Sequence, residues 1–114
     1  MTDGYFITTD DVQGVETFPN IIRRTLGVTD EVMLCEFHFQ AGAVVPEHSH
    51  MNDQVGYVIR GRMEFRIGDE VRILGPGGSY AIPGGVPHSA TILEECLAVD
   101  AFSPPRSDYL TEAK

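Results

Sequence analysis

A strict alternation of apolar and charged residues is the feature that most constrains how this chain can fold. In one stretch Met63, Phe65 and Ile67 alternate with three charged residues. In an extended strand this spacing places the apolar side chains on one face and the charges on the other. No helical periodicity persists through about the first hundred residues. The chain is therefore predicted to be an all-β protein.

The breaks between strands indicate how the strands are arranged. Gly68 and Asp69 predict a hairpin turn, after which Val71 and Ile73 are expected to resume the inward face. Four other stretches have strand-like composition: 32–40, 54–60, 79–82 and 95–102. Gly, Pro or Asp separates the strands at intervals of roughly 8 to 12 residues, a spacing that favours a sandwich or barrel of short antiparallel strands.

Length and composition bound the class of protein. The 114 residues contain no internal repeat or domain boundary, which predicts a single domain over 1–114. No apolar run reaches the ~20 residues that span a bilayer, and the first residues lack a signal-peptide pattern, so we expect a cytoplasmic protein without a membrane partner. Eight basic against 17 acidic residues exclude nucleic-acid binding. Cys35 and Cys96 lie among apolar neighbours and are expected to be buried and reduced.

The histidines are the candidate chemical groups. His48 and His50 point to the same face of an extended strand, and Gln54 has the same parity. His88 follows a turn rich in Gly and Pro. Imidazole is the commonest ligand of borderline divalent metals, and an amide oxygen can fill a fourth position. The fourth histidine, His38, alternates with two phenylalanines and is expected to face away from them in a structural role.

Two glycine-framed segments resemble the sequence motifs of the cupin superfamily. Residues 42–61 follow Gly-x5-His-x-His-x3/4-Glu-x6-Gly, and residues 77–92 follow Gly-x5-Pro-x-Gly-x2-His-x3-Asn. The resemblance implies a single cupin domain, a double-stranded β-helix or jelly-roll barrel. It also implies one divalent transition metal (Ni, Zn, Mn, Fe or Co) at the ligand positions. These positions are His48, His50, Gln54 and His88.

The chain departs from the cupin motifs at two positions. Gln54 stands where many cupins have Glu, and Ile92 replaces the final Asn. A neutral amide leaves the full +2 charge on a bound metal, which makes it a stronger Lewis acid and a better partner for an anionic substrate. Non-haem iron oxygenases commonly use two histidines and a carboxylate. The Gln therefore favours acid–base or isomerase chemistry over oxygen chemistry.

The last predicted strand adds a carboxylate to this site. Asp100 and Phe102 share one parity, so Asp100 faces the barrel interior if Phe102 does. A carboxylate inside an apolar barrel is costly unless it is paired or functional. Arg106 follows a Pro-Pro turn that could fold it back over the barrel mouth. Either Arg106 forms a salt bridge with Asp100 that pins the C-terminal segment, or both residues serve the site.

The His-His-Gln-His ligand set and the ending 100–110 together resemble the small single-domain KdgF-type cupins of pectin and alginate degradation. That resemblance implies a metal-dependent isomerase or tautomerase that converts 4,5-unsaturated uronate monosaccharides to linear keto forms. It implies catalytic or substrate-binding roles for Asp100, Phe102 and Arg106, with the C-terminal segment over the barrel mouth. It also implies a small anionic sugar-like substrate and a homodimer. The dimer interface would be an outer sheet face or an N-terminal strand around 5–7.

Two other classes of function stay open at this point. The chain could be a different metal-dependent cupin, such as a dioxygenase, an isomerase or a cyclase. Oxygen consumption that depends on Fe(II) would identify the first of these. It could also be a cupin that binds a small molecule without catalysis, in which case Asp100→Asn would change only stability.

Overall fold

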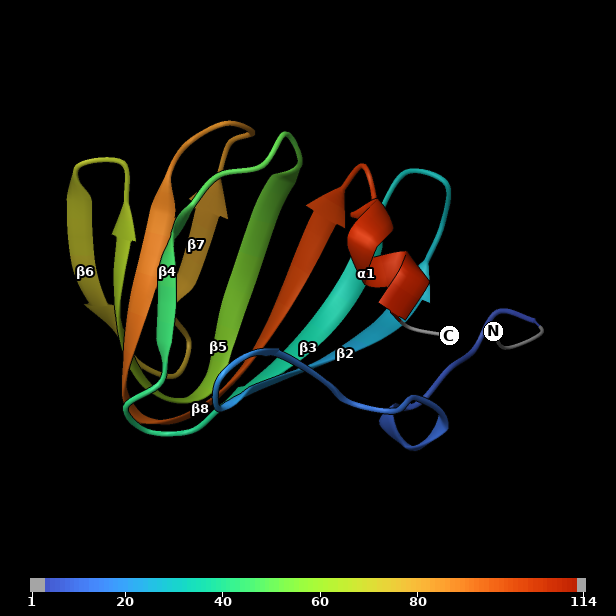
Figure 1. Ribbon diagram of the computed structural model, residues 1–114, viewed down its shortest axis with the longest axis horizontal. Helices are drawn as coiled ribbons and strands as arrows, with labels where there is room; N and C mark the ends of the chain where they lie inside the picture. Colours follow the sequence, from blue (N-terminus) through green and yellow to red (C-terminus); the bar gives the residue numbers. More distant parts are fainter. Residues whose placement is uncertain (1–3, 113–114) are drawn as a thin grey trace.

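The computed structural model describes residues 4–112 and is built almost entirely of strands (Figure 1). A short 3-10 helix, η1, precedes the strands, and one helix, α1, follows them. In chain order the elements are η1 (Thr9–Asp11), β1 (Val15–Phe18), β2 (Ile21–Val28), β3 (Met33–Phe39), β4 (Val44–His48), β5 (Asp53–Ile67), β6 (Glu70–Leu74), β7 (Ser79–Ile82), β8 (His88–Ser103) and α1 (Ser107–Glu112).

Two long strands, β5 and β8, run through both layers of the fold. The N-terminal half of β5 pairs with β7 and with the C-terminal half of β8, which continues through β3 and β2 to β1. The C-terminal half of β5 pairs with β6 and with the N-terminal half of β8, which also pairs with β4. The two layers face each other, and α1 lies over β2 and β3 (Figure 1). The predicted all-β jelly roll is confirmed.

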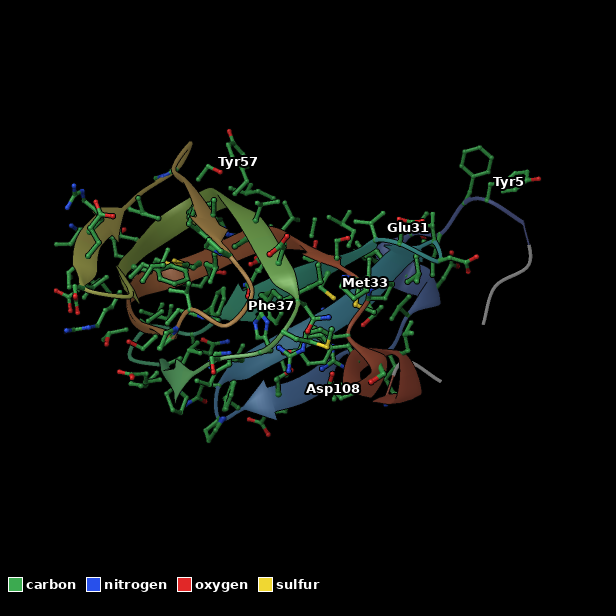
Figure 2. All side chains as sticks on the ribbon, turned by 90° about the horizontal axis from the view of Figure 1, so that it is seen from above. Tyr5, Glu31, Met33, Phe37, Tyr57 and Asp108 are labelled. Atoms are coloured by element: carbon green, nitrogen blue, oxygen red, sulfur yellow. The ribbon has the colours of Figure 1, made fainter. Side chains whose placement is uncertain are left out.

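The core lies between the two layers and follows the alternation of the strands. In β3 the inward residues Met33, Cys35, Phe37 and Phe39 are buried, and the residues between them are more exposed. Figure 2 shows Phe37 between the layers and Tyr57 on the outside. Cys35 is fully buried as a free thiol, as is the second cysteine, Cys96, so the prediction for the cysteines is confirmed.

The hairpin after β5 corrects one prediction. Val71 and Ile73 were expected to face inward, but they are 42% and 56% exposed. Phe65 pairs directly with Arg72, and residues paired across antiparallel strands lie on the same face of a sheet. A two-residue turn therefore places Arg72 on the inner side with Phe65 and turns its apolar neighbours outward.

Two elements that position the site were not predicted. The inward residues of β2 are Ile21, Arg23 and Thr25, all buried, and the charged residue among them hides the apolar alternation. The helix α1 is too short to show a helical period. Residues 5–7 form no strand here: Tyr5 is 99% exposed and points away from the sheets (Figure 2).

Residues 4–112 contain no helix that is long and apolar enough to cross a membrane. A cytoplasmic location stays a prediction.

Candidate metal centre and its buried carboxylate

Strand pairing brings three histidines together at one end of the barrel. His48 ends β4 and pairs directly with His88, the first residue of β8. His50 lies in the loop after β4, and the candidate ligand atoms of the three side chains all lie within 4.8 Å of one another. Two segments that are far apart in the sequence therefore deliver one cluster of imidazoles, as the sequence predicts.

Backbone carbonyls determine which ring nitrogen of each histidine faces the cluster. Each Nδ1 lies 2.9–3.1 Å from the carbonyl oxygen of a residue two positions away. A carbonyl oxygen only accepts, so each Nδ1 must carry the proton and donate. In a neutral imidazole that donates through Nδ1, the Nε2 lone pair is left for a ligand, the arrangement in which histidine binds metals.

The cluster fits a divalent metal on two observations. His88 Nε2 is buried without a hydrogen-bond partner among the described residues, and a buried polar atom of this kind is costly unless something binds it. Burial lowers the pKa of His88 to about 4, so its ring is neutral at physiological pH. Burial and the nearby Arg106 charge also lower the pKa of His50. Neutral imidazole nitrogens suit the transition metals predicted above.

Gln54 connects the histidine cluster to a buried carboxylate. Its Oε1 lies 3.0 Å from His50 Nε2, and its Nε2 donates to Asp100 Oδ2 at 2.6 Å. Because His50 donates through Nδ1, its Nε2 and Gln54 Oε1 are both acceptors. Two acceptors that converge in this way are expected of two ligands of one cation. Asp100 sets the orientation of the amide, because only the NH2 group can donate to it.

Asp100 is the buried carboxylate, 3% exposed on the inner face of β8. Burial raises its pKa to about 6, although Gln54 and the Tyr80 hydroxyl both donate to it. Tyr80 reaches Asp100 at 2.8 Å. A carboxyl group with a pKa near neutral can both accept and donate a proton under physiological conditions.

Arg106 does not form the salt bridge with Asp100 that the sequence left open. Its guanidinium instead binds Asp108 at 2.9 Å and donates to the Tyr109 hydroxyl at 3.0 Å. It also lies 5.6 Å from the centre of the Phe102 ring. The pair with Asp108 is local and half exposed, so it avoids the desolvation cost of a fully buried ion pair.

Six of the seven predicted site residues line one cavity. Its interior volume is about 60 Å³ and it opens to solvent. These residues are His48, Gln54, His88, Asp100, Phe102 and Arg106. The seventh, His50, packs edge-on against the buried Phe102 ring at 5.9 Å. The structure therefore brings all seven side chains into one neighbourhood.

A glycine in the second motif lets the two ligand-bearing loops meet. The Gly84 N–H donates to Asp53 Oδ1, and the Gly85 N–H donates to the His50 carbonyl, both at 2.8 Å. A Cβ on Gly84 would lie 2.2 Å from the Met51 carbonyl oxygen, closer than any real contact. Only glycine permits this approach, so the glycines hold the loops of His50 and His88 together.

Tyr80 is a site residue that the sequence analysis missed. In the register of the sheet, Tyr80, Gly56 and Asp100 lie side by side on β7, β5 and β8. A Cβ on Gly56 would lie 2.2 Å from the Tyr80 ring, so the ring passes over the glycine to reach Asp100. The signal was present, because alternation in 79–82 places Tyr80 on the inward face with Ile82.

His38 lies outside this site, as predicted. It faces outward from β3 and contacts Glu95 on the neighbouring strand β8. Arg60 also binds Glu95, through two bonds of 3.1 and 2.8 Å. These three residues form a polar cluster on the outer face of the sheet, which supports the structural role.

Comparison with known proteins defines the class to which this fold and site belong. The profile of the family described as "Cupin domain" matches residues 35–100. The chain therefore belongs to the cupin family.

Among cupins, the chain is similar to KdgF. It is 36% identical over 108 residues to the "Pectin degradation protein KdgF" of Dickeya dadantii (strain 3937), with 93% of this chain and 97% of that protein covered. The solved structure of KdgF from Halomonas sp. matches with a TM-score of 0.86 and 34% identity, over 92% of this chain and 97% of that one. An RmlC-like cupin from Shewanella frigidimarina matches with a TM-score of 0.88 and 27% identity, over 94% and 96%.

Proposed function

We propose that this protein is a metal-dependent enzyme that converts 4,5-unsaturated uronate monosaccharides into linear keto forms. The observation that carries the proposal is the link from the histidine cluster through Gln54 to the buried carboxyl of Asp100. Similarity to a pectin degradation protein over nearly the whole chain supports the substrate class. The site combines a place for a Lewis acid, a proton carrier and a guanidinium that can bind a carboxylate.

The proposed reaction is an isomerisation, so its atoms balance without a second substrate. A 4,5-unsaturated uronate carries an enol-ether double bond conjugated to its carboxylate. The proton leaves the C1 hydroxyl, the bond between C1 and the ring oxygen breaks, and C4 receives a proton. The products of these steps are an aldehyde at C1 and a ketone at C5. A divalent ion held by the three histidines and Gln54 would supply positive charge for the carboxylate and the developing enolate.

In this proposal Asp100 moves the proton to C4. Its pKa of about 6 lets it exchange protons at neutral pH, and positioned acid–base groups typically contribute about 10²- to 10⁴-fold to a rate. The bonds from Gln54 and Tyr80 hold the carboxyl in one orientation. Because the cavity interior is only about 60 Å³, the reacting edge of the sugar enters it and the rest lies in the mouth. Phe102 borders the ring and Arg106 binds the carboxylate.

Local positive charge at the site explains how a protein of negative net charge can bind an anionic substrate. The net charge is -9, which opposes an anionic substrate at long range. Exposed charges are screened over about 8 Å at physiological ionic strength. Arg106 is close enough to lower the pKa of both His50 and His88, so an anion in the mouth meets its charge before that of the distant acids.

The proposal is tested by the loss of ultraviolet absorbance of the conjugated double bond. Lyase-generated unsaturated uronate monomers are mixed with protein loaded with each candidate metal. We expect decay faster than in the protein-free control, and we expect a chelator to abolish the acceleration. Asp100→Asn is expected to remove the acceleration while metal content is unchanged, and Glu64→Gln, on the exposed face of β5, serves as the charge-matched control.

Two results would contradict the proposal. Normal turnover by Asp100→Asn would show that another group moves the proton. No acceleration with any of the metals would exclude the uronate reaction and leave the dioxygenase, cyclase and binding alternatives. Oxygen uptake with Fe(II) then separates the first of these from the others.

We also propose a homodimer, with the outer face of the β3–β8–β5 sheet at its interface. Leu34, Val55, Tyr57 and Ile59 are 40–51% exposed on this face, and Leu34 and Val55 both lie beside Ala101 of β8. Contiguous exposed apolar side chains of this kind are typical of protein interfaces. Light scattering on the purified protein would give the mass of two chains, and Tyr57→Glu would reduce it to one.

A further inference from the structure

The C-terminal helix places a tyrosine directly against the Arg106 guanidinium, which lines the cavity. Arg106 Nη1 donates to the Tyr109 hydroxyl at 3.0 Å, and the Arg106 guanidinium carbon lies 4.0 Å from the centre of the Tyr109 ring. One tyrosine therefore contacts this guanidinium through both its hydroxyl and its π face. The Arg106 side chain is only 16% exposed, so its position is well defined.

Tyr109 is itself held rigidly from several directions. It is 6% exposed, and its ring packs edge-on against Phe37 at 6.4 Å and Phe102 at 5.6 Å. The guanidinium carbon of Arg23 lies 3.9 Å from the ring centre. Thr25 donates its hydroxyl to the Tyr109 carbonyl at 3.4 Å. A side chain packed in this way is a fixed platform for a group that rests on it.

Arg106 keeps the donors that a carboxylate needs. Its Nε and Nη2 donate to Asp108, and its Nη1 donates to Tyr109. A guanidinium has five N–H groups, so among the described residues one N–H on Nη1 and one on Nη2 are left. These two groups are on neighbouring nitrogens of the guanidinium and can donate to the oxygens of a carboxylate. Arg106 and Tyr109 both line the cavity that contains Asp100.

We propose that Tyr109 is the positioning residue that fixes Arg106 in the lining of the cavity and so makes the site select sugars that carry a carboxylate. The inference rests on the proposed function, because it takes Arg106 as the group that binds the substrate carboxylate. Tyr109 acts through Arg106, so its loss weakens binding of the acid and leaves the proton-transfer step intact.

Binding of a sugar that cannot react tests the inference apart from catalysis. Calorimetric titration compares D-galacturonate with D-galactose, which differ in carrying a carboxylate or a hydroxymethyl group at C6. Tyr109→Phe keeps the ring and removes the hydroxyl. We expect it to bind galacturonate at least about tenfold more weakly than the unmodified protein, the usual effect of losing one hydrogen bond to a charged group, with no change for galactose.

Three further variants serve as controls. Arg106→Lys should lose the preference for galacturonate, because an ammonium lacks the two-pronged geometry. Tyr5→Phe removes a hydroxyl far from the site (Figure 2) and should change nothing. Asp108→Asn removes the exposed negative charge beside the same guanidinium but keeps a carbonyl oxygen that accepts from it, so it should not weaken binding of galacturonate. The titrations are repeated after chelation, where the ratio between variants should persist.

The outcomes separate this inference from the proposed function. Equal affinity of the unmodified protein for the two sugars, or unchanged galacturonate affinity in Tyr109→Phe, would overturn the inference. In the ultraviolet assay we expect Tyr109→Phe to raise KM and to leave kcat within about twofold. A protein that selects galacturonate in a Tyr109-dependent way but never turns over unsaturated uronates would keep the inference and refute the proposed reaction. Turnover of unsaturated uronates with an unchanged KM in Tyr109→Phe would support the proposed reaction and refute the role of Tyr109.

Discussion

Replacing Asp100 with Asn is expected to make the metal-free protein more stable at neutral pH, although it removes the proposed proton carrier. Burial raises the pKa of this carboxyl from 3.8 to about 6. The folded protein therefore binds this proton more tightly than the unfolded chain does. At neutral pH, folding moves an ionised carboxylate from water into the protein interior, which lowers the free energy of unfolding. An amide has no such charge.

The size of the effect follows from the pKa. The pKa of Asp100 is about two units higher in the folded protein, and one pKa unit corresponds to about 1.4 kcal/mol. The buried carboxylate therefore costs ~3 kcal/mol of stability above pH 6. This cost builds up as the pH rises from about 4 to about 6, and it is absent below about pH 4, where both states are protonated. Both oxygens of Asp100 accept a hydrogen bond, from Gln54 and from Tyr80, so the Asn amide must turn its NH2 group toward one of these donors, a mismatch that costs ~1 kcal/mol at every pH. The net gain is then ~2 kcal/mol at neutral pH.

Urea unfolding of chelated protein measures this effect at about pH 4.5 and pH 7.5. Asp100→Asn should gain ~2 kcal/mol over the unmodified protein at the higher pH, about 8 °C in melting temperature, and almost nothing at the lower. Glu64→Gln removes the same charge from an exposed position and corrects for the general relief of a net charge of -9. If the two variants show the same pH dependence, or if Asp100→Asn is destabilised equally at both pH values, then burial does not penalise this carboxylate and the reasoning fails.

Three other expectations follow from single contacts. Tyr80→Phe removes a donor that lowers the pKa of Asp100. The apparent pKa in the pH–rate profile of the enzyme should therefore move to a higher pH, and an unchanged profile would contradict this. Gly84→Ala would place a Cβ 2.2 Å from the Met51 carbonyl oxygen and should weaken metal binding roughly tenfold or more, measured as metal retained after dialysis. The two cysteines are fully buried, and burial raises the pKa of Cys35 to about 11. Both thiols should react with Ellman's reagent only in denaturant, and rapid reaction of the native protein would show that they are exposed.

The ligand side chains could be predicted because their geometry is local. His48 and His50 are two residues apart, so any extended backbone aims both at one face. The same argument places Asp100 inward with Phe102, and both are buried. The meeting of these groups with His88 was accessible only through the family motif, because strand pairing across the barrel joins them.

Predictions from the sequence were incomplete or wrong where they depended on which residue of another element a side chain contacts. Spacing alone left Arg106 free to reach Asp100, but the turn before α1 carries it to Asp108 and Tyr109. The inner face of β6 was assigned by apolar character, whereas its register with β5 places the exposed Arg72, and not Val71 or Ile73, on the same face as Phe65. In both cases the deciding interaction lies outside the local pattern.

The sequence by itself determined the strand character, the inward parity of the chemical groups and the family, because side-chain alternation and motif spacing are properties of neighbouring residues. Only the tertiary structure decided that Tyr80 reaches Asp100 across Gly56 and that Arg106 donates to the Tyr109 hydroxyl. These contacts join residues on different strands or follow from a turn, and their distances depend on sheet register and on the close approach that a missing Cβ allows.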